Sequence, residues 1–74
     1  MKLEEVRRRR FLSRDELAQR AGVSPTTVMH IEQGKVVPKM RTARRIAVAL
    51  EIEPAEIDEF RALIEGEPEG KAAA

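Results

Sequence analysis

Apolar residues recur along the chain at intervals of three and four, which is the spacing of an α-helix, and no stretch alternates like a strand. In the longest such pattern, Met40, Ala43, Ile46, Ala47 and Leu50 fall on one side of a helix. Five helices are predicted on this basis, over residues 2–10, 13–21, 25–33, 40–50 and 53–64. The fold class is therefore all-α, a compact bundle of five helices.

The joint between the second and third predicted helices carries the clearest boundary signals. Ser13 and Glu16 have the spacing of a capping box, in which each side chain accepts a hydrogen bond from the other residue's backbone amide. Gly22 ends the second helix as a left-handed residue, and Ser24 caps a third helix that begins at Pro25. Two short helices joined in this way form a helix-turn-helix. Because many small bundles contain such corners, the turn alone leaves the function open.

Length and composition exclude several classes of protein. With 74 residues the chain predicts one small domain, expected over residues 1–64, and residues 65–74 are expected to be a disordered tail. There is no cysteine, and His30 is the single histidine, so neither a metal site nor a cofactor is expected. Ser13 and Ser24 are explained as helix caps, and no paired catalytic groups remain, so the protein is not expected to be an enzyme. No apolar run approaches a membrane span and no signal peptide is visible, so a cytoplasmic protein is expected.

The formal net charge of +1 conceals an uneven distribution. Residues 1–45 hold 12 basic and 5 acidic residues, a net charge of +7, whereas residues 46–74 hold 2 basic and 8 acidic residues, a net charge of −6. Such a split indicates that one end of the molecule meets an anionic partner. The alternative is that these charges only keep the helices soluble.

The third predicted helix has an unusual polar face. Val28 and Ile31 fall on the side that must face the core. The other arc is short and uncharged and consists of Pro25, Thr26, Met29, His30 and Gln33. Small polar and apolar groups of this kind suit the DNA major groove, where they can bond base edges and touch thymine methyl groups. Cations placed to reach phosphates surround the arc, and they are Arg14, Lys35, Lys39 and Arg41.

The segment from Leu12 to Lys35 resembles the Cro/lambda-repressor-like (XRE-type) helix-turn-helix family. It contains Leu-Ala, Ala-Gly-Val-Ser and Ile-Glu-x-Gly at the spacings typical of that family, and the resemblance extends over residues 3–64. It implies a five-helix DNA-binding domain that acts as a transcriptional regulator, expected here to be a repressor. It also implies a homodimer on a palindromic operator in double-stranded DNA.

The resemblance assigns roles to individual positions. The base-reading positions fall on Pro25, Thr26, Met29 and His30. The positions that contact the DNA backbone fall on Arg14, Thr27, Gln33, Lys35, Lys39 and Arg41. Arg7 and Glu32 match a pair that forms an ion bridge between the first and third helices. The chain departs from the family at Phe11 and Glu51, where glycine is common, and at Pro25, which cannot donate or accept a side-chain hydrogen bond.

The dimer interface is expected on the fifth predicted helix and the residues just before it, because DNA occupies the third. The candidate residues are Ile52, Ile57, Phe60, Leu63 and Ile64. Leu63 lies off the line of the others, which leaves apolar surface for a self-complementary patch. The alternative is that the whole set covers the core.

Two other functions remain open at this point. The chain could be the antitoxin of a toxin–antitoxin pair, although little apolar sequence remains outside the domain to bind a toxin. It could also be a helical protein-interaction module, although the basic ring and the uncharged face argue against this. No sensor for a small-molecule ligand is expected.

Overall fold

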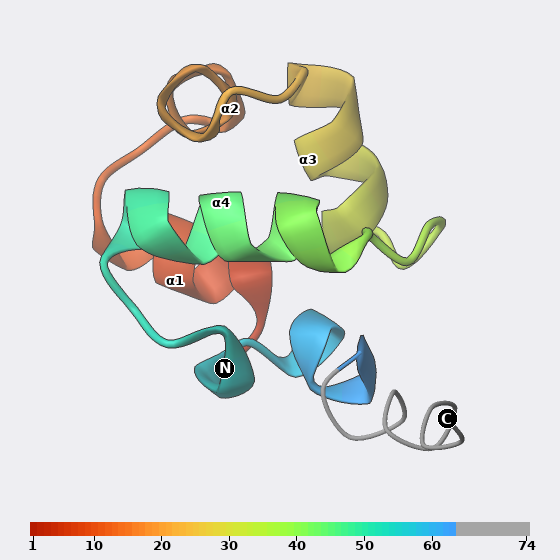
Figure 1. The fold of residues 1–74 in the computed structure, drawn as a ribbon. Coiled ribbons are helices and arrows are strands. Elements are labelled where there is room, and N and C mark those ends of the chain that lie inside the picture. The colour runs from red at the N-terminus through yellow and green to blue at the C-terminus, as the bar shows by residue number, and fades with distance from the viewer. Residues whose placement is uncertain (64–74) are drawn as a thin grey trace.

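The structure, a computed structural model, describes residues 1–63. The predicted C-terminal tail of residues 65–74 lies outside the described residues. The helices are α1 (Leu3–Arg9), α2 (Arg14–Ala21), α3 (Pro25–Glu32) and α4 (Met40–Leu50), followed by the 3₁₀ turn η1 (Pro54–Glu56) and helical residues 58–63. No strand occurs among residues 1–63 (Figure 1). The predicted all-α class is confirmed.

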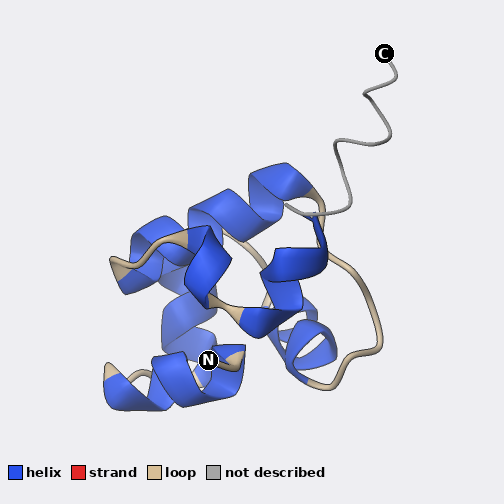
Figure 2. Ribbon diagram, turned by 90° about the horizontal axis from the view of Figure 1, so that it is seen from below, coloured by secondary structure: helices blue, strands red, loops and turns tan. Residues whose placement is uncertain are grey.

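Helix α4 lies across the middle of the molecule, and the other elements pack around it (Figures 1 and 2). Helix α2 packs against both α3 and α4, and α1 packs against α3. The predicted apolar stripe of α4 is buried except at the half-buried Met40, with Ala43, Ile46 and Leu50 fully enclosed. Its opposite side carries exposed arginines, so α4 separates the core from a basic surface.

The boundaries of α2 and α3 follow from hydrogen bonds at their ends. The Ser13 Oγ accepts from the Glu16 amide at 3.0 Å, and the Glu16 carboxylate accepts from the Ser13 amide at 2.8 Å, which completes the predicted capping box. Gly22 has a φ of 75° and ends α2 in the left-handed conformation. The Ser24 Oγ accepts from the Thr27 amide at 3.1 Å and caps α3.

All four α-helices end in the same left-handed turn. In each, an amide just beyond the turn donates to the carbonyl five residues earlier, as Leu12 does to Arg7 at 3.2 Å and Ile52 does to Ala47 at 3.0 Å. Glycine occupies the left-handed position after α2 and α3, but Phe11 (φ 58°) and Glu51 (φ 59°) occupy it after α1 and α4. Non-glycine residues in this conformation are strained by contact between Cβ and the following carbonyl oxygen.

The predicted start of the fifth helix, at residue 53, is wrong. Pro54 opens only the short turn η1, and Ile57 is extended (φ −98°, ψ 119°), so that the helix begins at Asp58. The break has a tertiary cause, because the N-terminus bonds to this segment. The Met1 amino group donates to the Glu56 carbonyl at 2.9 Å, and the Asp58 amide donates to the Met1 carbonyl at 2.7 Å.

Candidate nucleic-acid interface

Helix α3 divides into a buried side and an accessible side. Val28 and Ile31 are fully buried against the rest of the bundle, as the spacing predicts. The four residues expected to read bases lie together on the accessible side, where Pro25 and Thr26 are exposed and Met29 and His30 are half-buried. Their surface contains no charged side chain, so it can approach base edges closely.

Thr27 lies at the start of the same helix and takes part in the cap. Its hydroxyl shares a hydrogen bond of 2.9 Å with the Ser24 hydroxyl, and its backbone amide donates to the same Ser24 oxygen. The side chain is half-buried, so the cap holds it in one orientation at the edge of the α3 surface.

A buried carboxylate links α1, α2 and α3. The Arg7 Nε donates to Glu32 Oε2 at 2.7 Å, and the Arg14 Nε donates to Glu32 Oε1 at 3.0 Å. The Glu32 side chain is 2% exposed, whereas that of Arg14 is 39% exposed. Arg7 also donates to the Leu12 carbonyl at 2.9 Å, so the buried guanidinium keeps partners on two sides.

This cluster of Arg7, Arg14 and Glu32 contains both an expected and an unexpected pair. Arg7 and Glu32 lie in contact, as the sequence led us to expect. Arg14 was expected to be a free phosphate ligand, but its Nε is occupied by Glu32. Because a guanidinium has five donors, the accessible part of Arg14 can still bond to a phosphate while Glu32 fixes its orientation.

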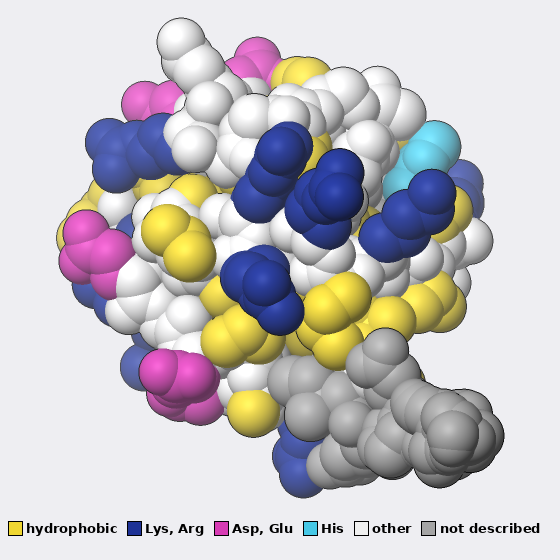
Figure 3. Space-filling view, viewed as in Figure 1, with side chains coloured by type: hydrophobic (Ala, Val, Ile, Leu, Met, Phe, Trp, Pro, Cys, Tyr) yellow, Lys and Arg dark blue, Asp and Glu magenta, His cyan; other side chains and the backbone are white. Residues whose placement is uncertain are grey.

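The remaining residues expected at the DNA backbone lie around the C-terminal end of α3 and the start of α4. Gln33, Lys35, Lys39 and Arg41 are all exposed. None of the three cations in this set has an ion pair with a described residue. Figure 3 shows Lys and Arg side chains gathered on the face that includes α4, with the histidine at its margin.

Three further arginines escaped the sequence analysis. Arg20 of α2 and Arg44 and Arg45 of α4 join Arg41 around a groove of about 610 Å³ between the two helices. The apolar residues of this groove are Ala21, Met40 and Val48. The signal was present in the sequence, because Arg41, Arg44 and Arg45 follow helical spacing on the side of α4 opposite its apolar stripe.

The predicted dimer interface needs correction. Ile57 and Phe60 are fully buried in the core, so neither can contact a second chain. Ile52 and Leu63 are half-buried and pack against that core, and Ile64 lies outside the described residues. For these two residues the alternative stated above, that the set covers the core, describes the structure.

Residues 1–63 contain no candidate metal centre. Among residues 1–63 there is no group of three or more His, Cys, Asp or Glu side chains that could hold a metal ion. No helix within this range has the length and apolar character needed to cross a membrane.

Comparison with known proteins agrees with the geometry of α2 and α3. A family model described as a helix-turn-helix domain matches residues 1–60, which includes α1 to α4, η1 and Phe60. The searches of curated proteins and of solved structures each gave no match.

Proposed function

Because the chain belongs to the Cro/lambda-repressor-like helix-turn-helix family, we propose that it binds double-stranded DNA at a specific sequence and regulates transcription. The observation that carries this proposal is the accessible side of α3, where four uncharged side chains lie together, flanked by cations that form no ion pair with any of residues 1–63. A surface of this kind can enter the major groove while its margins contact the two phosphate backbones.

Each residue of the α3 surface has a role that its chemistry permits. Thr26 and His30 carry groups that hydrogen-bond to base edges, and Met29 offers an apolar contact to a thymine methyl group. Pro25 has no side-chain donor or acceptor, so it contributes only by shape.

The surrounding residues position the helix on the duplex. Lys35, Lys39 and Arg41 bind phosphates through charge, and Arg14 does so while held by Glu32. Thr27 and Gln33 complete this set with neutral hydrogen bonds. These contacts provide affinity and register, whereas the α3 surface provides specificity.

We propose that the protein acts as a homodimer on a palindromic operator and represses transcription there. One recognition helix reads too few base pairs to specify a site in a genome, so two copies combine half-sites about one helical turn, or ~34 Å, apart. Bound near a promoter, such a dimer excludes other proteins from the same DNA. We propose the cytoplasm as the site of action.

The first experiment selects bound duplexes from a random library and measures affinity for the selected site across a salt series. With about four phosphates neutralised per subunit, we expect a slope of about −3 to −4 in the logarithmic plot. Lys39→Ala should reduce this slope by about one and weaken all sequences alike. The control is Arg8→Ala, because Arg8 pairs with Glu4 on α1. A flat salt response would contradict DNA binding and favour a protein-interaction module.

The second experiment separates base contacts from phosphate contacts. Thr26→Ala or His30→Ala should relax the preference at particular base pairs, and removing one direct hydrogen bond to a base should cost about 1–3 kcal/mol. Lys39→Ala serves as the comparison. If all three variants weakened every sequence equally, the assignment of the α3 surface would be wrong.

A further inference from the structure

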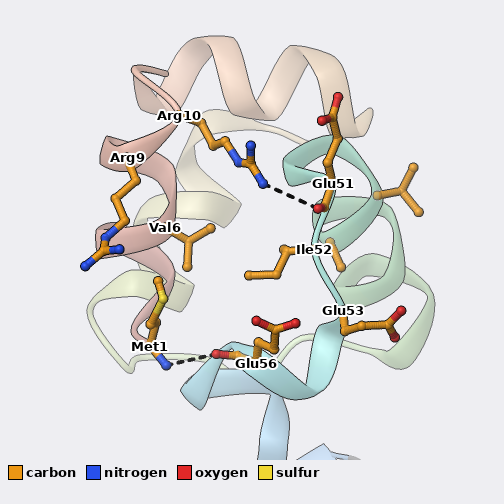
Figure 4. Close-up of a pocket in the computed structure, with 10 residues that line it drawn as sticks. Met1, Val6, Arg9, Arg10, Glu51, Ile52, Glu53 and Glu56 are labelled. Carbon is orange, nitrogen blue, oxygen red and sulfur yellow. Dashed lines mark hydrogen bonds between the residues drawn. The ribbon is translucent and has the colours of Figure 1, made fainter.

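Two grooves of similar size differ in how far the folded chain satisfies its own polar groups. The groove of about 710 Å³ between α1 and the segment that follows α4 is bridged by the chain itself (Figure 4). Arg10 donates to the Glu51 carbonyl at 3.4 Å, and the Met1 amino group donates to the Glu56 carbonyl at 2.9 Å. The groove of about 610 Å³ between α2 and α4 is crossed by no ion pair between residues 1–63. We call it the α2–α4 groove.

The α2–α4 groove carries positive charge that the described chain does not balance. Its cations are Arg20 from α2 and Arg41, Arg44 and Arg45 from α4, and no aspartate or glutamate lines it. Arg20 follows Glu16 by one turn of α2, so that carboxylate balances part of its charge. The three arginines of α4 are exposed and form no ion pair with any of residues 1–63. The unbalanced charge therefore lies on α4.

These arginines belong to one stripe of α4. Arg41, Arg44, Arg45 and Val48 stand at i, i+3, i+4 and i+7, so they share a side of the helix and extend along about 10 Å of its axis. The Arg45 Nη1 lies 3.9 Å from the point that a Cβ on Gly22 would occupy. It thus reaches the C-terminal end of α2, where the helix dipole favours a cation. Arg41 and Arg44 have no comparable role within the fold.

Apolar surface lies among the arginines. Val48 is 71% exposed and Met40 is half-buried, and both line the groove. Figure 3 shows apolar side chains between the Lys and Arg side chains of this face. An exposed valine adds nothing to the core and has a lower helix propensity than lysine or glutamate. Arginine beside exposed apolar groups is typical of protein interfaces, in which lysine is depleted.

We propose that the α2–α4 groove binds an acidic amphipathic helix of another protein. Carboxylates of that helix would pair with Arg41, Arg44 and Arg45, and an apolar side chain between them would cover Val48. The stripe of about 10 Å matches two turns of a helix. A DNA backbone is the other anion that the arginines could bind. It offers nothing apolar to Val48, and no residue of α3 lines the groove.

The position of Arg41 connects this partner to DNA. Arg41 belongs to the proposed phosphate contacts and also lines the α2–α4 groove. An acidic helix in the groove would occupy it and place negative charge beside the DNA backbone, so each ligand should weaken binding of the other. The partner would then release the protein from its operator. This consequence rests on the proposed function, whereas binding of the helix does not.

The first test is calorimetric titration of the full chain, without DNA, by a synthetic helical peptide with glutamates and leucines along one face. The peptide is about 18 residues long, because shorter isolated helices are marginal in water. We expect a dissociation constant below about 100 μM at low salt. Arg44→Gln/Arg45→Gln should weaken binding at least about ten-fold, whereas Lys35→Gln/Lys39→Gln, which removes two cations outside the groove, should change it by less than about two-fold. No binding at about 1 mM peptide, or equal losses in both variants, would overturn the proposal.

The second test isolates the apolar contact with two valines of matched exposure. Val48 is 71% exposed in the groove, and Val37 is 72% exposed in the loop before α4. Val48→Ser should weaken peptide binding about five-fold and Val37→Ser should leave it unchanged, because only the first loses covered apolar surface. Serine and valine have similar helix propensities, so α4 is expected to stay intact, which circular dichroism checks. Equal binding of wild type and Val48→Ser would overturn the assignment of an amphipathic partner.

DNA binding by the same variants separates this proposal from the proposed function. For Arg44→Gln/Arg45→Gln we expect the salt slope on the selected duplex to equal that of wild type. A slope reduced by about two would assign the groove to the DNA backbone and overturn the proposal. With wild type, added peptide should weaken binding to the duplex, and unchanged DNA affinity at saturating peptide would contradict the coupling through Arg41. If the peptide binds but no duplex is selected, the groove stands and the proposed function fails.

Discussion

The α2–α3 unit and the segment of residues 51–63 reach their structures in different ways. In the α2–α3 unit, each helix begins and ends through hydrogen bonds between residues at most five positions apart, as at Ser13 and Ser24. The later segment is fixed by the other end of the chain, where Met1 and Leu3 bond to Glu56 and Glu59. Short-range signals suffice for the first region, whereas the second depends on the completed fold.

The two regions also differ in whether their residues serve mainly binding or mainly stability. The α2–α3 unit leaves one side of α3 accessible, so substitutions there are expected to alter binding more than folding. The later segment places Ile57 and Phe60 in the core, so substitutions there are expected to alter folding first.

The largest expected effect is a loss of stability from a substitution in the segment of residues 51–63. Phe60→Ala removes a fully buried ring and should reduce the free energy of unfolding by about 3–5 kcal/mol. Urea denaturation monitored by circular dichroism measures the change. Leu63→Ala is the control, because Leu63 is only half-buried and should cost less than half as much. Equal losses would mean that Phe60 is no more a core residue than Leu63.

The next effect concerns the cluster that joins the α2–α3 unit to α1. Glu32→Gln leaves the buried Arg7 without a counter-charge and should cost roughly 3 kcal/mol, the lower end of the range for a broken buried pair, because Arg7 keeps the Leu12 carbonyl. The same variant frees Arg14, so its DNA affinity should also change.

A double variant separates these two effects of Glu32. Arg7→Met/Glu32→Leu removes both charges of the buried pair and should be more stable than Glu32→Gln alone. If it were less stable than the single variant, the buried pair would be a net source of stability in itself.

The distance along the chain over which each interaction acts explains which features could be predicted from the sequence. Capping residues and glycines act within one turn of a helix, so the limits of α2 and α3 and the accessible side of α3 were predictable. The pairing of Arg7 with Glu32 was expected from the family resemblance. The extended conformation of Ile57 and the bond from Arg14 to Glu32 were not predictable, because each depends on residues that only the folded chain brings together.

A smaller effect of opposite sign is expected at the two helix ends that lack glycine. Phe11 is 92% exposed and has a φ of 58°, so Phe11→Gly relieves strain without removing buried surface. We expect the free energy of unfolding to increase by about 1 kcal/mol. Phe11→Ala is the control, because alanine keeps the Cβ and should give no such increase. A gain from alanine equal to that from glycine would rule out backbone strain as the cause.

The smallest expected effect is the pH dependence of stability that arises from the Ser13–Glu16 capping box at the start of α2. Hydrogen bonds from the Ser13 amide, and next from the Ser13 hydroxyl, hold the pKa of the Glu16 carboxyl below its ordinary value of 4.5. A carboxyl with a lowered pKa in the folded state stabilises the fold above its unfolded pKa, and this contribution disappears as the pH falls through the folded value. Glu16→Gln keeps a capping residue but cannot titrate. Urea denaturation of both proteins between pH 7 and pH 3 should therefore give a constant advantage of the wild type at neutral pH that shrinks below about pH 4.5. An advantage that persists unchanged at pH 3 would show that the charge of Glu16 takes no part in the cap.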